Sequence, residues 1–416
     1  AKARAGISDE ALYVELSLIL AAIRCDHTKA ELSKSLEQDR QAAEVYLPFQ
    51  FQIIDDRAII TKPGLETGLK AGDEIISLDG IALERWIQLV TDLVPVDGYN
   101  DHTKPQVIAY DNEFMGGAID HFAPFLAALQ VNAVVEVLRD SQTLEFMVPR
   151  VTYADYQTIV GEKRFGQDFL DAIRFERLGE DSAYLAVDTF VNYRRPVDPV
   201  EKLRPMFEAM ASENRTKLIV DLRQNGGGSN DAQETLLRYL LDKPIVTYHP
   251  SLIRTLNIPD KIRNNLSTWD ESALSPPPEL FFERADGFYS FKGDDRVAEP
   301  LPGSFQGKLI VLIGPQNSSG TVHLLAQLRK SGRATLIGSR TGGSPTGATA
   351  GKIAFLELPE SGIRVRVPLM RTVVADPEDL LPTDHGIDPD VSVSLTVADT
   401  IAGVDAVLEH AKRELE

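Results

Sequence analysis

Cysteine is nearly absent from this chain of 416 residues, which contains Cys25 and no other. A single thiol excludes an internal disulfide and any metal site built from several cysteines. Low cysteine content is typical of a reducing cytoplasm, but many exported bacterial proteins share it. The cysteine count alone therefore leaves the compartment open.

Long hydrophobic runs are lacking as well. No apolar stretch reaches the roughly 18 residues expected of a membrane-spanning helix, so we expect no membrane span. The chain opens Ala-Lys-Ala-Arg-Ala, without a methionine. We expect from this a mature or trimmed chain whose export signal has been removed.

Positive charge is in short supply, because 43 lysines and arginines face 62 aspartates and glutamates, for a net charge of −19. A field of this sign repels phosphate backbones and anionic membrane surfaces, so neither nucleic acid nor a membrane is expected as a partner. The remaining composition, 43% hydrophobic and 25% charged, is that of a globular protein. At this length we expect more than one domain.

Residues 1–46 are predicted to form an N-terminal helical segment. Apolar residues recur at helical spacing from Asp9, and a second, more polar helix is predicted through Ala30–Leu36. Between these helices lies Arg24–Thr28, a short polar interruption that reads Arg-Cys-Asp-His-Thr.

Residues 47–151 change to short strands. Gly68–Gly80 reads Gly-Leu-Lys-Ala-Gly-Asp-Glu-Ile-Ile-Ser-Leu-Asp-Gly, a strand closed by a tight Asp-Gly turn. This segment resembles a PDZ domain, so a PDZ-like domain is expected here. The stretch Trp86–Phe125 exceeds what such a domain needs, and the sequence suggests no role for it.

Residues 152–416 alternate strands and helices, which predicts an α/β (α+β) fold. Strands are expected at 217–222 and 309–313, and helices at 200–212 and 232–241. The proline-rich segment 250–302 is expected to be an inserted loop or cap. One amphipathic helix is expected at Ala398–Leu415.

Two loops in this region could carry chemistry. Asp221–Gly228 reads Asp-Leu-Arg-Gln-Asn-Gly-Gly-Gly after an apolar strand, and its glycines could present backbone N–H groups to an anion or oxyanion. A plain strand-to-helix turn explains it equally well. A Walker A loop is excluded because no Gly-Lys-Ser/Thr follows. Ser318 and Ser319 begin a helix after the next strand, as a helix cap or as a nucleophile.

Together these loops resemble the C-terminal-processing (tail-specific) serine peptidases and their tricorn-like relatives. Three further segments carry the resemblance: Phe305–Ile313, Gly332–Gly343 and His385–Val391. The resemblance implies a crotonase-like peptidase core that acts on peptides or unfolded protein segments without a metal or organic cofactor. Because such peptidases in bacteria are commonly exported, it also implies a periplasmic or secreted bacterial protein, with which the missing methionine agrees. It also implies Ser319 as the nucleophile, with the oxyanion held by the N–H of Gly320 and that of Gly227 or Gly228.

The lysine that serves as general base in processing peptidases is missing. Ser344 stands at the position of that lysine, and Ala348 stands where those enzymes carry a glutamine. Lys352 lies eight residues after Ser344, which makes it a poor substitute for the missing lysine. A serine needs a positioned base, and histidine is the usual alternative. The seven histidines are His27, His102, His121, His249, His323, His385 and His410.

The tricorn-like branch carries its catalytic histidine ahead of the PDZ-like domain, and Cys25–Thr28 resembles its "D.HT" element. The resemblance thus implies His27 as the general base. His323 is an alternative, because it lies one helical turn after Ser319. For the acid that orients the histidine, the resemblance implies Asp384, with Glu378 and Asp26 as alternatives. A turn or cap role would also explain Asp384.

Three functions are consistent with these residues. The first is a serine peptidase working through an acyl-enzyme, whose PDZ-like domain binds an extended segment. The second is a catalytically degenerate member of the fold that binds a peptide or a small hydrophobic ligand, which the lost lysine would favour. The third is a crotonase-like acyl-transfer enzyme, which the PDZ-like domain disfavours. A homo-oligomeric state stays open.

Overall fold

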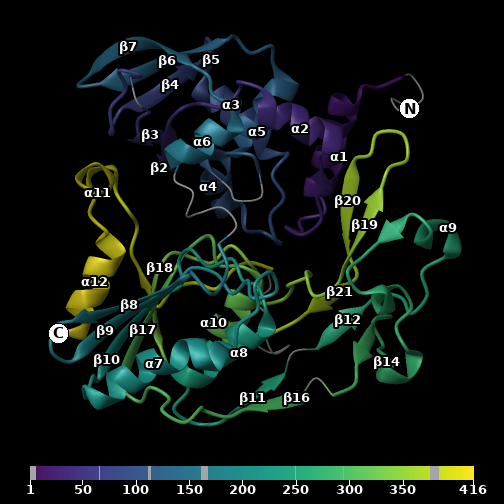
Figure 1. Ribbon diagram of the computed structural model, residues 1–416, viewed down its shortest axis with the longest axis vertical. Helices are drawn as coiled ribbons and strands as arrows, with labels where there is room; N and C mark the ends of the chain where they lie inside the picture. Colours follow the sequence, from purple (N-terminus) through teal and green to yellow (C-terminus); the bar gives the residue numbers. More distant parts are fainter. Residues whose placement is uncertain are drawn as a thin grey trace.

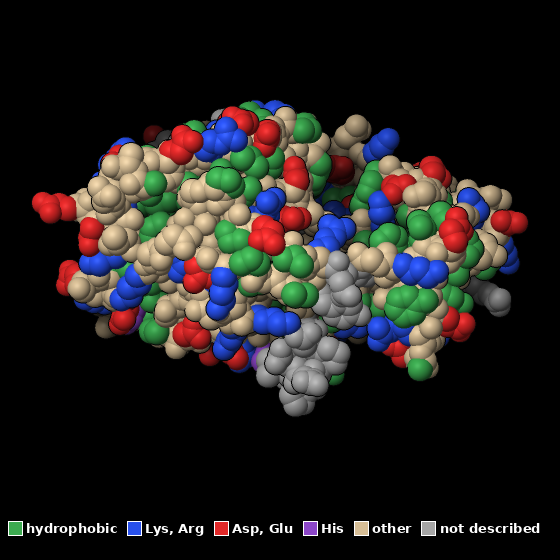
Figure 2. Space-filling model, turned by 90° about the horizontal axis from the view of Figure 1, so that it is seen from below, with side chains coloured by type: hydrophobic (Ala, Val, Ile, Leu, Met, Phe, Trp, Pro, Cys, Tyr) green, Lys and Arg blue, Asp and Glu red, His purple; other side chains and the backbone are tan. Residues whose placement is uncertain are grey.

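The computed structural model describes residues 6–64, 66–110, 114–160, 167–248, 250–293, 295–374 and 384–416. In Figure 1 an N-terminal part, residues 6–160, lies above a C-terminal part, residues 167–416. None of the helices formed by the described residues has the length and apolar character needed to cross a membrane. Figure 2 shows acidic and basic side chains interspersed over the face seen there, so the negative net charge is not gathered into one patch on that face.

The centre of the C-terminal part is a six-stranded sheet. Its order is β22 (Val391–Ser392), β18 (Thr335–Gly338), β17 (Lys308–Ile313), β10 (Lys217–Asp221), β9 (Ser182–Val187) and β8 (Ile173–Leu178). Neighbouring strands pair in parallel, except that β8 is antiparallel to β9. The predicted alternation of strands and helices is confirmed, and the fold is α/β.

Helices cover both faces of this sheet (Figure 1), which explains the uninterrupted apolar runs of its strands. The side chains of Leu218, Val220 and Val311 pack under α7 (Pro199–Ser212), α8 (Asn230–Leu240) and α10 (Ser319–Ser331). The alternate residues, including Ile219 and Ile310, pack against α12 (Ala406–Leu415). Each such aliphatic side chain contributes about 1.5–3 kcal/mol when fully buried.

The N-terminal part is built on an antiparallel sheet. Its order is β2 (Gln50–Ile54), β3 (Arg57–Lys62), β4 (Glu74–Leu78), β6 (Asn132–Arg139) and β7 (Gln142–Pro149), with β5 (Ile81–Ala82) paired to β4. The stretch for which the sequence suggested no role forms α3 (Leu83–Thr91), η2 (Asp101–Thr103), α4 (Lys104–Ala109) and α5 (Ala118–Leu126). These helices bury Trp86 and Phe122 in the core, and α6 (Tyr153–Val160) follows the sheet.

The first 46 residues differ from prediction at one point. Helix α1 (Asp9–Ala21) is present, but the second helix, α2 (Lys34–Ala42), begins later than predicted. Ala30–Glu31 instead forms β1, which pairs with β20 (Arg364–Pro368) more than three hundred residues away. Ser33 then caps α2 by accepting a hydrogen bond from the N–H of Leu36. The distant strand, which no local pattern reveals, decides the conformation of Ala30.

The segment 250–302 is more regular than the loop or cap that we expected. It contains β12 (Ser251–Ile253), α9 (Asp260–Arg263), β13 (Leu266–Ser267), η4 (Glu271–Leu274), η5 (Pro278–Leu280), β14 (Phe281–Glu283), β15 (Tyr289–Phe291) and β16 (Asp295–Ala298). These strands pair with β11 (Ile245–Tyr248), β19 (Ile353–Glu357) and β21 (Met370–Thr372). The predicted single C-terminal helix is wrong, because Gly403, with φ +65°, ends α11 (Val397–Ala402) before α12 begins.

Several contacts join the N-terminal and C-terminal parts, and two of them lie on opposite sides of the molecule. The β19–β20 hairpin reaches up to β1 beside α1 (Figure 1), and Glu31 forms ion pairs with Arg364 and Arg366 there. At the other side, Ile401 of α11 lies so close to Gly72 that a Cβ on the glycine would come within 3.0 Å of it. These contacts hold the N-terminal segment, with His27, over the C-terminal sheet.

Candidate active site

The serine turn lies at the carboxyl end of β17. Asn317, which is fully buried, organises it: its Oδ1 accepts from the N–H of Gly314 at 2.8 Å, and its Nδ2 donates to the carbonyls of Leu222 and Asn225. The side chain of one residue therefore fastens the serine turn to the glycine loop of 221–228. No local sequence pattern predicted this role for Asn317.

Ser319 is the first residue of α10 and has φ +47°, in the left-handed region that costs a side-chain-bearing residue about 1–3 kcal/mol. Its hydroxyl makes no hydrogen bond with any described residue. Ser318 is the N-cap by position, yet its hydroxyl makes no capping bond and donates instead to the carbonyl of Gly226 at 2.8 Å. The two serines thus differ. Ser318 links the turn to the glycine loop by a hydrogen bond, whereas the hydroxyl of Ser319 makes no hydrogen bond with a described residue.

The glycine loop touches this serine directly. An added Cβ on Gly227, which has φ +103°, would lie 2.9 Å from both the nitrogen of Gly320 and the Cβ of Ser319. Only a residue without a side chain allows this approach. The N–H of Gly227 is already used, because it donates to Asn225 Oδ1 at 2.9 Å.

The N–H groups of Gly228 and Gly320 are the better-placed pair of donors. An ideal Cβ on Gly320 would lie 3.8 Å from the nitrogen of Gly228, so the two backbone segments adjoin. Neither N–H donates to a described residue. Two unengaged N–H groups beside a helix N-terminus are suited to a developing oxyanion. Of the two predicted glycines in the loop, the geometry favours Gly228.

Asn225 fixes the shape of the glycine loop. It is fully buried, its Nδ2 donates to the carbonyl of Val187 at 2.9 Å, and its Oδ1 also accepts from Thr321 Oγ1 at 2.6 Å. The asparagine stands in the loop motif that the sequence analysis quoted, but without an assigned role. An asparagine just before a glycine run was the signal available for it.

A third loop, residues 341–349, packs against the serine turn. The N–H of Gly343 donates to the carbonyl of Asn317 at 2.8 Å, and a Cβ on Gly343 would lie 2.7 Å from Ser318 Cα. The next residue, Ser344, stands where processing peptidases carry their lysine. Its hydroxyl and that of Thr346 both donate to the carboxylate of Asp384. The lysine amine is thus absent from this position, and two hydroxyl groups that donate to an acid lie there instead.

Asp384 is held from the N-terminal part. Its carbonyl accepts from the N–H of Tyr99 at 2.7 Å, and a Cβ on Gly98 would lie 2.1 Å from that same oxygen. The carboxylate accepts from Ser344 and Thr346, and among the described residues it makes no hydrogen bond to His27. The structure therefore does not bring Asp384 into the orienting contact that we predicted for it.

His27 lies between α1 and β1, beside the same third loop. Its Nδ1 is 3.2 Å from Thr349 Oγ1, which is also 3.1 Å from Cys25 Sγ. One ring nitrogen of His27 and one carboxylate oxygen each of Asp26 and Asp97 lie within 4.8 Å of one another. The loop 341–349 therefore contacts the serine turn through Gly343 and the histidine through Thr349.

Asp97 is an acid that the sequence analysis missed, since it falls in the stretch to which no role was given. Its side chain is 5% exposed, and its Oδ1 accepts from the N–H of Asp26 at 2.9 Å. Burial, together with the negative charges of Asp26 and Asp384, raises the pKa of Asp97 to about 7. No local pattern distinguishes this aspartate from others, because its importance comes from the distant segments that meet it.

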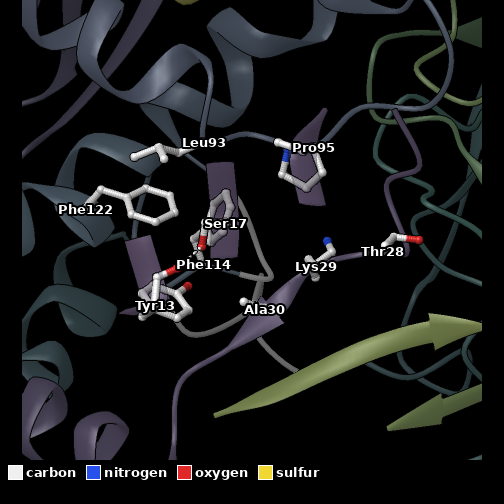
Figure 3. Close-up of a pocket in the computed structure, with 10 residues that line it drawn as sticks. Tyr13, Ser17, Thr28, Lys29, Ala30, Leu93, Pro95, Phe114 and Phe122 are labelled. Atoms are coloured by element: carbon white, nitrogen blue, oxygen red, sulfur yellow. Dashed lines mark hydrogen bonds between the residues drawn. The ribbon is translucent and has the colours of Figure 1, made fainter. Parts of the chain in front are cut away.

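The other candidates have different surroundings. His323 is buried on α10, and Lys352 forms an ion pair with Asp270, which occupies its ammonium group. Glu378 and His249 lie outside the described residues. Figure 3 shows a small cavity that Tyr13, Thr28, Lys29, Pro95 and Phe122 help to line. At about 10 Å³ it has room for about one water molecule and none for a peptide.

The sequence profile described as peptidase family S41 matches residues 181–393, which run from β9 to β22. No curated protein matches the chain.

Among solved structures, mature CPAF is 16% identical with a TM-score of 0.65, covering 99% of this chain and 88% of that one. Its complex with lactacystin has a TM-score of 0.58 at 16% identity, covering 98% and 88%. The photosystem II D1 C-terminal processing protease is also 16% identical, covering 95% and 86%, with a TM-score of 0.42. The likeness to CPAF shows a shared fold over nearly the whole chain.

Proposed function

Because the chain belongs to peptidase family S41 and is thereby a serine peptidase, we propose that it cleaves peptide bonds through an acyl-enzyme formed on Ser319, with His27 as general base. The resemblance drawn from the sequence motifs is confirmed at the level of the family. The observation that carries the proposal is the strained Ser319, φ +47°, beside the unengaged N–H groups of Gly228 and Gly320.

In the proposed reaction, His27 takes the proton of Ser319 Oγ as that oxygen attacks the carbonyl carbon of the substrate. The carbonyl oxygen gains the negative charge, and the N–H groups of Gly228 and Gly320 donate to it. The carbon–nitrogen bond then breaks, and the imidazolium gives its proton to the leaving amine. Water attacks the resulting ester, again with its proton passing through His27, and Ser319 is released.

Thr349 sets the tautomer of His27 in this scheme. When Nδ1 carries the hydrogen and donates to Thr349 Oγ1, 3.2 Å away, Nε2 is left with a lone pair to accept the proton. The nearby carboxylates of Asp26 and Asp97 favour the positive charge that His27 acquires. We assign Asp384 to a different task, which is to hold the loop 341–349 through Ser344 and Thr346.

The substrates that we propose are peptides or unfolded protein segments. The N-terminal antiparallel sheet, whose sequence is PDZ-like, has β2 and β7 as its edge strands and could add such a segment as a further strand. We place the activity in the periplasm or outside a bacterial cell, which fractionation of the producing organism would test.

Labelling with a fluorophosphonate probe tests the proposal. We expect the wild-type protein to be labelled, and Ser319→Ala and His27→Ala to lose labelling. Ser318→Ala is the matched control: it removes a neighbouring hydroxyl that is bonded to Gly226 and should leave labelling within a few-fold of wild type. No labelling of the wild type, or labelling that survives Ser319→Ala, would overturn the assignment.

A further inference from the structure

Asp26, His27 and Asp97 form a cluster of three donor groups from two distant segments. One ligand atom from each lies within 4.8 Å of the others. We propose that this cluster is an inhibitory binding site for a divalent cation of the zinc class, and that the bound cation blocks the peptidase at His27. The inhibitory half of this inference rests on the proposed function, whereas cation binding does not.

The donor set and spacing suit such an ion. Zn²⁺ accepts imidazole nitrogen and carboxylate oxygen, with three protein ligands and one position left for water. Bonds of about 2.0–2.1 Å place tetrahedral ligand atoms about 3.3 Å apart. Atoms within 4.8 Å of one another must therefore close by about 1.5 Å at most, which side-chain rotation of Asp26 and His27, both half-buried, can supply.

Asp97 gives independent support. Its side chain is 95% buried, since 5% is exposed, yet only Oδ1 is hydrogen-bonded, to the N–H of Asp26. Among the described residues nothing donates to Oδ2. Oδ2 can therefore coordinate a cation without losing a hydrogen bond to a described residue.

The charge around the cluster favours a dication. Asp26 and Asp384 are the acidic groups whose negative charges act on Asp97. Lys29 opposes them, with its Nζ 3.4 Å from Asp26 Oδ1. Among the described residues the cluster thus has more acidic groups (Asp26, Asp97 and Asp384) than basic ones (Lys29), and a cation gains from this balance. Replacing Lys29 with Gln should therefore tighten cation binding.

Coordination would stop His27 from acting as a base. A neutral imidazole has one free lone pair, because its other nitrogen carries a hydrogen. Metal binding at either nitrogen uses that lone pair, so none remains to accept the proton of Ser319. The cation would thus remove the general base without displacing the serine or the oxyanion donors.

The binding test uses the full-length Ser319→Ala chain, so that it does not depend on activity. Titration calorimetry with Zn²⁺ should show one ion bound per chain. The affinity for Zn²⁺ should fall at least about 10-fold when either Asp97→Asn or His27→Ala is added to the Ser319→Ala chain. Asp101→Asn is the matched control, since Asp101 lies in the same loop but pairs with Arg24 and Lys104. No binding, or binding unaffected by Asp97→Asn and His27→Ala, overturns the site.

The inhibition test uses fluorophosphonate labelling of the wild type. Saturating Zn²⁺ should slow labelling at least about 10-fold, a chelator should restore it, and residual labelling of Asp97→Asn should be insensitive to Zn²⁺. Zinc binding without slower labelling contradicts the inhibitory role. Wild-type protein that is never labelled, even without metal, defeats the proposed peptidase and with it the inhibition, while the binding result stands by itself.

Discussion

The hydroxyl of Ser344 donates a hydrogen bond to the carboxylate of Asp384. This pair occupies the position where the processing peptidases place a lysine base. No lysine amine stands there to accept the proton of Ser319, and the carboxylate of Asp384 already accepts from Ser344 and Thr346, so we propose another acceptor for that proton. The same pair gives Asp384 a structural task, since the acid lies against the loop that contacts both the serine turn and His27.

Removing the hydroxyl of Ser344, which donates to Asp384, should destabilise the loop 341–349. We expect Ser344→Ala to lower the free energy of unfolding by about 1–3 kcal/mol, because the carboxylate of Asp384 loses a charge-assisted hydrogen bond. Labelling by a fluorophosphonate should slow about 10-fold. Urea denaturation and labelling rates measure the two effects, and Ser339→Ala, outside this contact, serves as control. Unchanged stability and rate would show that the pair does not hold the loop.

Two glycines beside Ser319 should respond differently to an added methyl group. Gly227→Ala should abolish labelling, because its Cβ would lie 2.9 Å from Ser319 Cβ and its φ of +103° suits glycine alone. Gly320→Ala keeps its N–H and meets no atom closer than 3.8 Å. We expect labelling within a few-fold of wild type and a gain of about 0.5–1 kcal/mol in stability from the helix. The reverse order of the two variants would refute the geometry proposed for the oxyanion site.

Thr349 is a positioning residue in the proposed mechanism. Thr349→Val removes the hydroxyl at Nδ1 of His27, so the ring loses its tautomer preference and its orientation. We expect a 10- to 100-fold fall in kcat against a peptide substrate, a small change in KM and a shifted pH profile.

Thr349→Ser should restore most of the activity, since it keeps the hydroxyl. If Thr349→Ser is as impaired as Thr349→Val, or if Thr349→Val behaves as wild type, the hydroxyl does not position the histidine.

The sequence predicted the core because its signals are local. The apolar run of 309–313 and the helix of 200–212 are visible in a short window, and both are present as β17 and α7. The place after such a strand left Ser318 and Ser319 as a cap or a nucleophile, and the family resemblance, which the match over residues 181–393 confirmed, implied Ser319.

What the sequence could not predict depends on contacts between distant segments. Ala30 pairs with Val365, so a stretch with helical spacing becomes a strand. Asp97 reaches the site only because the loop after α3 meets both Asp26 and the segment that carries Asp384. Nothing in the spacing of residues 86–125 indicates that meeting. The roles of Asn225 and Asn317 were missed for a related reason, since a buried amide that links two loops leaves no periodic pattern.

The pair formed by Tyr13 and His121 predicts a pH dependence of stability. The hydroxyl of Tyr13 lies 2.8 Å from Nε2 of His121, and Nδ1 accepts a hydrogen bond from the N–H of Met115. If the ring were protonated, Nδ1 would carry a hydrogen too, and two donors would face each other. Burial lowers the pKa of His121 from 6.5 to about 3. At this histidine the unfolded chain therefore binds a proton more readily than the folded chain does. The free energy of unfolding consequently falls as the pH falls below 6.5. Between pH 7 and pH 5 the loss is about 2 kcal/mol.

The neighbouring Asp120 acts in the opposite direction. Burial raises its pKa from 3.8 to about 6, so its contribution to stability grows as pH falls through that range. The effect of the histidine is therefore measured by comparing wild type with His121→Gln. Both proteins contain Asp120, so its effect on stability is the same in each. We expect His121→Gln to be less stable at pH 7, through loss of the hydrogen bond to Tyr13, but to lose about 2 kcal/mol less than wild type on acidification to pH 5. Urea denaturation at both pH values measures this difference, and parallel losses in the two proteins would show that His121 is not held neutral by its surroundings.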